Sequence, residues 1–199
     1  GLRGSLSNTS WSLAYYKNDY KDFIAYEYLF PPIQGVLQVQ YQNLGSVETD
    51  GIEFESKTVF NDNLSASFGI SLNDGKEDDG YLDSLSPDHA KISLSWISDS
   101  GRLRWNTVST LMESSRSNLS PVCGRSGVCS PAQGTAGRVT LDTYLNFDLT
   151  EKVNIKFGIR NLTDVKYWDY PTIAGQAAGT ADEYLMPGRN MSFSIRYSL

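Results

Sequence analysis

The sequence predicts an all-β chain that forms part of an antiparallel transmembrane β-barrel, and three observations lead to this fold class. Apolar and polar residues alternate with a period of two over many stretches, which is typical of strands with two different faces. Aromatic residues make up 12% of the 199 residues, a composition that favours strands. Short polar turns alternate with long connecting segments, as in outer-membrane barrels.

The alternation defines the expected strands. From residue 191 to residue 199, apolar residues at the odd positions alternate without exception with Ser and Arg at the even positions. The same period recurs at residues 64–72 and 153–159, and the pattern as a whole amounts to about nine strands. In chain order, these nine strands cover residues 11–26, 36–41, 49–60, 64–72, 90–96, 103–111, 141–149, 153–159 and 191–199, and the short stretch 2–6 is expected to be the end of a further strand.

The connections between these strands are of two kinds. Residues 61–63, 98–101 and 150–152 form short polar turns, whereas the long segments cover residues 73–89, 113–138 and 164–189. Loops this long are uncommon inside a compact soluble domain. They fit a barrel with short periplasmic turns and long extracellular loops. The alternative is a secreted β-sandwich, an adhesin or a sugar-binding module, whose strands also alternate.

Charge and composition exclude several classes of function. The net charge of −6 is a poor match to a nucleic-acid backbone, so no nucleic-acid partner is expected. With one His and no Gly-x-Ser-x-Gly motif, the chain lacks the groups of a nucleophilic hydrolase, and we predict that it is not an enzyme. Cys123 and Cys129 lie in a polar stretch and form either a loop disulfide or two unpaired thiols.

Three local motifs point to one family. Residues 41–55 resemble the Asn-x-Gly-x-x-x-x-x-Gly-x-Glu segment of TonB-dependent outer-membrane receptors. Residues 157–167 resemble their penultimate-strand signature, Asn-Leu-x-Asp-x-x-Tyr, and residues 187–190, Pro-Gly-Arg-Asn, resemble the entry to their closing strand. The order and spacing of the three motifs agree with the family over essentially the whole chain.

This resemblance implies that residues 1–199 are the C-terminal part of a larger barrel of about 22 strands in the bacterial outer membrane. The plug domain and the N-terminal barrel strands of the family are absent from this sequence. The implied mechanism is binding and gated translocation driven by the TonB complex, with no intrinsic cofactor. Outer-membrane lipid and lipopolysaccharide would surround the barrel.

Within the family, two details resemble the haem/haemoglobin receptor branch: Tyr167-Trp168 after the Asn-Leu-x-Asp motif, and residues 81–87. The implied transported ligand is haem, taken from haemoglobin or another haem carrier at the extracellular loops. A ferric-siderophore receptor is the alternative, because such receptors share most of the same motifs.

Imidazole and phenolate groups can ligate haem iron, so the candidate contact residues are one histidine and several tyrosines. These candidates are His89, Tyr81, Tyr167 and Tyr184, with Tyr170 beside them. For each residue, packing at the barrel rim or within a loop is the competing interpretation.

Overall fold

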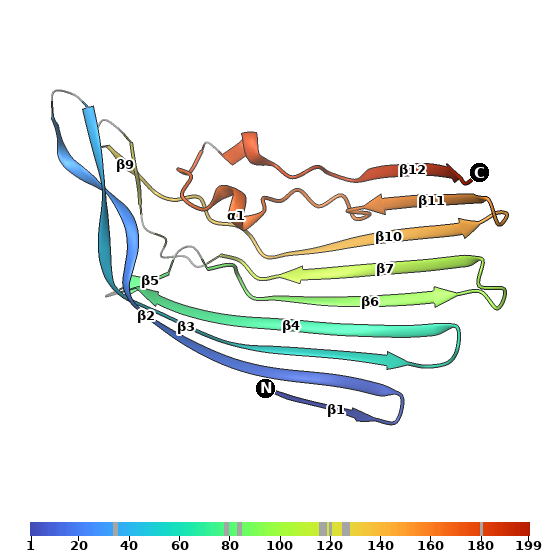
Figure 1. Cartoon of the computed structure of the whole chain (residues 1–199). Helices are drawn as coiled ribbons and strands as arrows, with labels where there is room; N and C mark the ends of the chain where they lie inside the picture. The colour runs from blue at the N-terminus through green and yellow to red at the C-terminus, as the bar shows by residue number, and fades with distance from the viewer. Residues whose placement is uncertain are drawn as a thin grey trace.

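The computed structural model describes residues 1–33, 36–77, 80–82, 85–115, 119, 121–124, 128–179 and 181–199. Within these residues one large antiparallel sheet runs in the order β1-β2-β3-β4-β6-β7-β10-β11-β12, with the short strand β5 beside β4 (Figure 1). A separate pair, β8 and β9, forms a small hairpin. The strands are β1 (Leu2–Leu6), β2 (Thr9–Ile33), β3 (Val36–Val59), β4 (Leu64–Glu77), β5 (Gly80–Tyr81), β6 (His89–Ile97), β7 (Leu103–Met112), β8 (Val122–Cys123), β9 (Cys129–Ser130), β10 (Arg138–Asp148), β11 (Val153–Arg160) and β12 (Asn190–Tyr197).

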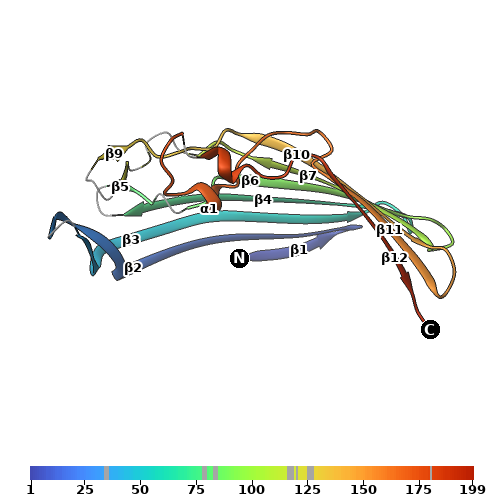
Figure 2. The same cartoon turned by 90° about the horizontal axis from the view of Figure 1, so that it is seen from above.

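The large sheet is an open, curved wall and not a closed ring. Figure 2 shows the curvature, with β1 and β12 along the two free edges. Neighbouring strands of the wall are also neighbours in sequence, apart from the short strands that lie in the loops. This arrangement is the one expected for an arc of an antiparallel barrel wall, and the expected fold class is confirmed.

The outward face of the wall is apolar and exposed. Ile92 on β6 pairs with Phe68 on β4, and both side chains lie on the outward face. The exposed fraction of the residue is 48% for Ile92 and 65% for Phe193 on β12. Among the described residues, the buried apolar residues are Val47, Tyr170 and Ile173. A soluble sandwich of this length would instead enclose a core between two sheets.

The inward face is polar, and its side chains bond to one another across the strands. The hydroxyl oxygens of Ser67 and Ser93 are 2.6 Å apart, on β4 and β6. The Arg104 guanidinium on β7 donates to Asp148 Oδ2 on β10 at 2.9 Å. A wet interior permits such a face, whereas a dry core between sheets would not.

The expected short turns join the strands at one end of the sheet. In the turn at residues 98–101, Gly101 has a φ of 70°, a conformation that glycine adopts without steric cost. The turn joins the ends of β6 and β7, and two tryptophans near these ends, Trp96 and Trp105, pair with each other. Trp105 donates from Nε1 to Thr143 Oγ1 at 2.8 Å. Aromatic residues at this level of the outward face fit an interfacial girdle.

The separation of residues 36–41 from residues 49–60 was a wrong expectation, since β3 runs through both. The Asn-Leu-Gly-Ser stretch at 43–46 resembles a turn, but it pairs with β2, as in Lys21 with Ser46 and Phe23 with Leu44. Asp22 lies between those two pairs and has no pairing partner of its own in β3. Its φ of 56° is the left-handed conformation, which marks a local irregularity in β2. The β2–β3 ribbon therefore continues well beyond the other strands (Figure 1).

The long segment at residues 164–189 was expected without helix, yet it contains α1 (Tyr170–Ile173) and a single 3-10 turn (Ala181–Tyr184). Pro171 at the start of α1 fixes a helical φ and lacks the N–H that a first turn would leave unpaired. A helix of one turn is too short to give a periodic sequence signal. Among the described residues, no helix is long and apolar enough to cross a membrane.

A close approach at Gly51 yields a prediction about the wall. A Cβ atom at Gly51 would lie 2.5 Å from Tyr16 Oη and 2.6 Å from the backbone oxygen of Leu72. Because the backbone oxygen cannot move away cheaply, Gly51→Ala is expected to lower the free energy of unfolding by about 1–3 kcal/mol. The control is Gly69→Ala on β4, where a Cβ would meet nothing closer than 3.9 Å.

Both variants are compared by urea unfolding of the detergent-solubilised protein, followed by tryptophan fluorescence. Equal midpoints for Gly51→Ala and Gly69→Ala would contradict the close packing of Tyr16 over Gly51.

Candidate binding site at the loop end of the sheet

The long loops gather at the end of the sheet opposite the short turns (Figure 1). Two of them pair with each other through their backbones. The Gln133 amide donates to the Gln176 oxygen at 2.8 Å, and the Ala178 amide donates to the Pro131 oxygen at 2.8 Å. Tyr170, in α1, is only 3% exposed. The described parts of the loops at 113–137 and 161–189 therefore contact each other in one layer.

The Asn-Leu-x-Asp motif forms the turn that leads from β11 into this layer. Asn161 is 3% exposed and has a φ of 50°. Its amide group bonds to both backbone groups of Val165: Nδ2 donates to the Val165 oxygen at 2.8 Å, and Oδ1 accepts from the Val165 amide at 2.9 Å. Asp142 Oδ1 accepts from the Asn161 amide at 2.8 Å. Asparagine suits this position because it tolerates the left-handed conformation and bonds locally.

The last residue of the motif joins the two ends of the long segment. Asp164 Oδ1 accepts from the Arg189 amide at 2.7 Å, where the chain enters β12. A Cβ at Gly188 would lie 2.7 Å from the same oxygen, so a larger residue there would have to displace the Asp164 side chain. Residues 165–188 therefore form a loop whose ends are held together.

Arg138, the first residue of β10, ties this loop to the wall. Its side chain is 6% exposed, and its guanidinium lies 3.0 Å from Asp169 Oδ1. The guanidinium carbon is 4.4 Å from the centre of the Tyr167 ring, a cation–π contact. Nη1 of Arg138 is buried and has no hydrogen-bond partner.

His89 lies on the same inward row of the sheet. It pairs with Ser71 on β4 and with Met112 on β7, and Met112 pairs with Arg138 on β10. His89 and Arg138 are therefore two strands apart. Nδ1 of His89 is buried without a hydrogen-bond partner.

The structure places the tyrosine candidates in different settings. Tyr167 packs on Arg138, and Tyr184 is half-buried at the end of the 3-10 turn. Tyr81 lies in β5, and its side chain is outside the described part of the chain. Within the described ranges, no group of three His, Cys, Asp or Glu residues is placed to hold a metal ion.

Arg138 and Asp169 were missed by the sequence analysis. The sequence does contain one sign of Arg138: it is a charged residue directly after a Gly-containing loop, at the point where an alternating strand begins. Its partner lies 31 residues further along the chain, so no local pattern could indicate the pair.

Two hollows could receive a ligand, one at the loop end and one on the wall nearer the short turns. A cavity of about 360 Å³ beneath the loops is lined by Asp88, Glu113, Ser115 and Tyr170 together with leucines. A wider hollow of about 900 Å³ on the inward face of the wall is lined by serines and by four charged residues. These four residues are Arg3, Lys57, Lys91 and Glu55. The excess of cations gives the wider hollow a positive field, which favours anionic ligands.

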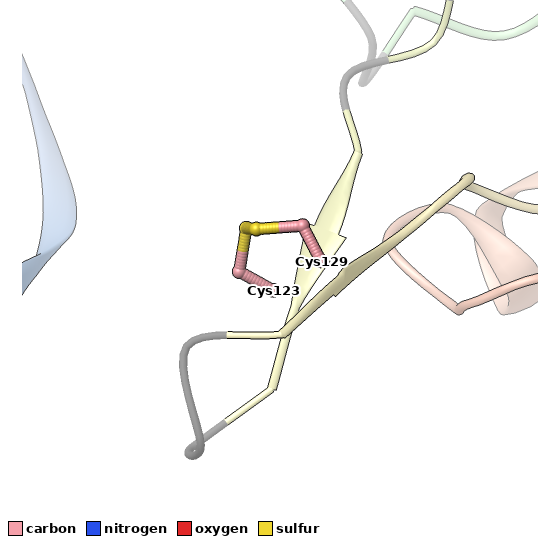
Figure 3. Close-up of a disulfide and its surroundings, with 2 residues drawn as sticks. All are labelled: Cys123 and Cys129. Atoms are coloured by element: carbon pink, nitrogen blue, oxygen red, sulfur yellow. A yellow bond between two sulfur atoms is a disulfide. The ribbon is translucent and has the colours of Figure 1, made fainter.

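A disulfide closes a small hairpin within the same loop layer. The sulfur atoms of Cys123 and Cys129 are 2.02 Å apart, and Figure 3 shows the two side chains meeting across β8 and β9. The Gly124 amide donates to the Val128 oxygen at 2.9 Å next to the bridge.

Comparison with known proteins agrees with this architecture. The family model "TonB dependent receptor-like, beta-barrel" matches residues 1–162. No curated protein sequence matches the chain. The chain is similar in fold to the copper transporter OprC, with a TM-score of 0.77 and 17% identity, covering 99% of this chain and 31% of that one.

Two further solved structures share the fold. One is the pyoverdine outer-membrane receptor FpvA of Pseudomonas aeruginosa PAO1, with a TM-score of 0.72 and 16% identity over 96% of this chain and 27% of that one. The other is the ferric yersiniabactin uptake receptor FyuA of Yersinia pestis, with a TM-score of 0.67 and 18% identity over 99% of this chain and 28% of that one. The chain thus spans less than a third of these relatives. The family match, together with the two-faced antiparallel wall, shows that the chain belongs to the TonB-dependent receptor-like β-barrel family of the Gram-negative outer membrane.

Proposed function

We propose that residues 1–199 form the C-terminal part of a receptor barrel that captures an iron-bearing ligand and passes it inward under the control of the TonB complex. The observation that carries this proposal is the division of one sheet into an exposed apolar face and a polar, hydrogen-bonded face, with loops at one end whose described parts bond to each other. Lipid and lipopolysaccharide would cover the apolar face. The loops would meet the ligand and any carrier protein.

Haem is the ligand that we propose first. The Tyr167-Trp168 pair that resembles the haem-receptor branch lies in the loop layer, where the ring of Tyr167 contacts Arg138. Haem carries two propionate carboxylates, and the cations of the wider hollow suit an anionic ligand. A ferric siderophore is the second candidate, because two of the similar structures are receptors for pyoverdine and ferric yersiniabactin.

Titration separates the two candidates. The protein purified from outer membranes in detergent is titrated with haemin, ferripyoverdine and ferric yersiniabactin, and both the Soret band and the tryptophan fluorescence are recorded. Saturable binding of haemin with a shifted Soret band supports haem. Quenching by a ferric siderophore, with no shift of the Soret band, would replace haem by the second candidate.

The role of His89 has its own prediction. With Nδ1 buried beneath the loops, we expect His89 to be a rim residue, so His89→Ala should change the haemin dissociation constant by less than tenfold. His89→Gln is the control, because it retains a polar side chain of similar size. A loss above tenfold in both variants, about 1.4 kcal/mol, would instead make His89 an iron ligand.

A further inference from the structure

The outward face of the wall has a notch where β4, β6, β7 and β10 approach the loops. Ala90 on β6 pairs with Ile70 on β4 and with Leu111 on β7, and Leu111 pairs in turn with Val139 on β10. These residues face outward, because Ile70 and Ala90 each lie two positions from a member of the outward pair described above, and paired residues share a face. A hollow of about 460 Å³ is lined by this row and by Leu72, the next outward residue on β4. Ala90 has the smallest side chain of the row and forms the floor of the hollow, which we call the Ala90 notch.

The Ala90 notch lies at the outer edge of the hydrocarbon. Ala90 is the second residue of β6, and Leu111 is the last but one residue of β7. The next outward positions toward the loops are Asp88 and Glu113, and both line the hollow. Because a charged side chain is costly in hydrocarbon, these carboxylates mark the level of the lipid head groups. The notch therefore faces the upper part of the acyl chains in the extracellular leaflet, which is built from lipopolysaccharide in Gram-negative bacteria.

A notch holds an acyl chain better than a flat apolar surface does. Lipid tails are as apolar as leucine, so removal from water favours no apolar surface over another inside a membrane. The preference comes from van der Waals contacts, which are individually small and add up with the number of neighbouring atoms. A chain in the Ala90 notch would contact Ile70 and Leu111 on its two sides and Ala90 beneath it.

The carboxylate of Glu113 sets the chemistry at the top of the notch. Glu113 is exposed, and no hydrogen bond or ion pair joins its side chain to another of the described residues. Asp88 beside it already accepts from the Asn73 amide through Oδ1 at 2.8 Å. An ionised carboxylate only accepts hydrogen bonds, so it favours a head group that carries donors. Lipopolysaccharide carries donors in its sugar hydroxyls and in the hydroxyls of its acyl chains, whereas the ester linkages of a glycerophospholipid are acceptors only.

We propose that one acyl chain of a lipopolysaccharide molecule occupies the Ala90 notch, and that hydroxyl groups near the head of this chain donate to Glu113. The proposal rests on the proposed function only in taking the apolar face as the surface that meets lipid. It goes beyond the general contact of a barrel with lipid, because it assigns one position at which a lipid stays bound during purification.

Lipid retention by the protein purified from outer membranes in a mild detergent tests this site. Native mass spectrometry gives the fraction of protein molecules that carry lipopolysaccharide, and Ala90→Leu, which fills the notch, should lower this fraction at least threefold. Ala90→Ser leaves the notch open and should keep the wild-type fraction. The matched control is Ala66→Leu, because Ala66 is an outward alanine that pairs with Leu94 near the short turns. This control adds the same volume in the other leaflet and should leave the fraction unchanged.

Glu113→Leu tests the hydrogen bonds while the notch stays intact. It should also lower the lipopolysaccharide-bound fraction at least threefold, whereas Glu113→Gln keeps an acceptor oxygen and should lower it less. Each variant is checked for folding by heat-modifiable mobility on a gel. If Ala90→Leu does not fold, the Glu113 pair decides the outcome.

A wild-type protein that carries glycerophospholipid and no lipopolysaccharide would overturn the proposal. Equal retention by the wild type and folded Ala90→Leu would do the same, as would an equally large loss in Ala66→Leu, because the effect would then not belong to the notch. The measurement uses neither haemin nor a siderophore. Failure of either to bind would therefore remove the proposed transported ligand without changing the outcome for the lipid site.

Discussion

Ile92→Arg is expected to lower the free energy of unfolding of the barrel by about 2–4 kcal/mol, because Ile92 lies on the outward face near the middle of its strand, at the level of the hydrocarbon. Ile92 is 48% exposed and pairs with Phe68 on the same face, so no acidic group on the neighbouring strands would neutralise the arginine. The measurement is urea unfolding in lipid vesicles, followed by tryptophan fluorescence.

The control for this variant is the next residue. Ser93→Arg places the same charge on the inward face, where it loses only the hydrogen bond with Ser67, a cost of about 1 kcal/mol. If the barrel tolerates arginine equally well at positions 92 and 93, the outward face does not lie in hydrocarbon.

Asn161→Ala is expected to lower the free energy of unfolding by about 3 kcal/mol. The change leaves both backbone groups of Val165 without their buried partners, and it places an alanine at a φ of 50°. Asn161→Gly removes the same hydrogen bonds but accepts the backbone conformation, so it should recover about 1 kcal/mol.

Asn8→Ala is the matched control, since Asn8 is an exposed turn asparagine whose Nδ2 donates to the Val59 oxygen. Its effect on the urea midpoint should be small. An Asn161→Ala variant as stable as Asn8→Ala would show that the motif does not lock the turn after β11.

Most of the wall could be predicted from the sequence, because each strand carries its own local signal. Strands β4 and β11 begin where the alternation begins, at Leu64 and Val153, and the turns before them are short and polar. The period of two also assigns the two faces without any knowledge of the neighbouring strands. The exception is β3, where cross-strand pairing with β2 outweighs a local sequence that resembles a turn.

The loop end was less predictable, because its contacts join residues that are distant in sequence. The Asn-Leu-x-Asp motif could be recognised, but the hydrogen bonds of Asn161 and the clip from Asp164 to Arg189 are visible only in the fold. The pairing of Arg138 with Asp169 depends on how the loop returns to the wall. The secondary-structure propensities of the loop residues do not indicate how the loop returns to the wall.

The most direct test of the membrane-facing wall is a scan of spin labels along β4, from residue 64 to residue 72, in lipid vesicles. Relaxation by oxygen, which concentrates in hydrocarbon, should peak at Leu64, Ala66, Phe68, Ile70 and Leu72. Relaxation by a water-soluble nickel chelate should peak at the serines and the glycine between them. A strand whose even-numbered positions are shielded from both reagents would place those side chains in a protein core and would contradict the barrel wall.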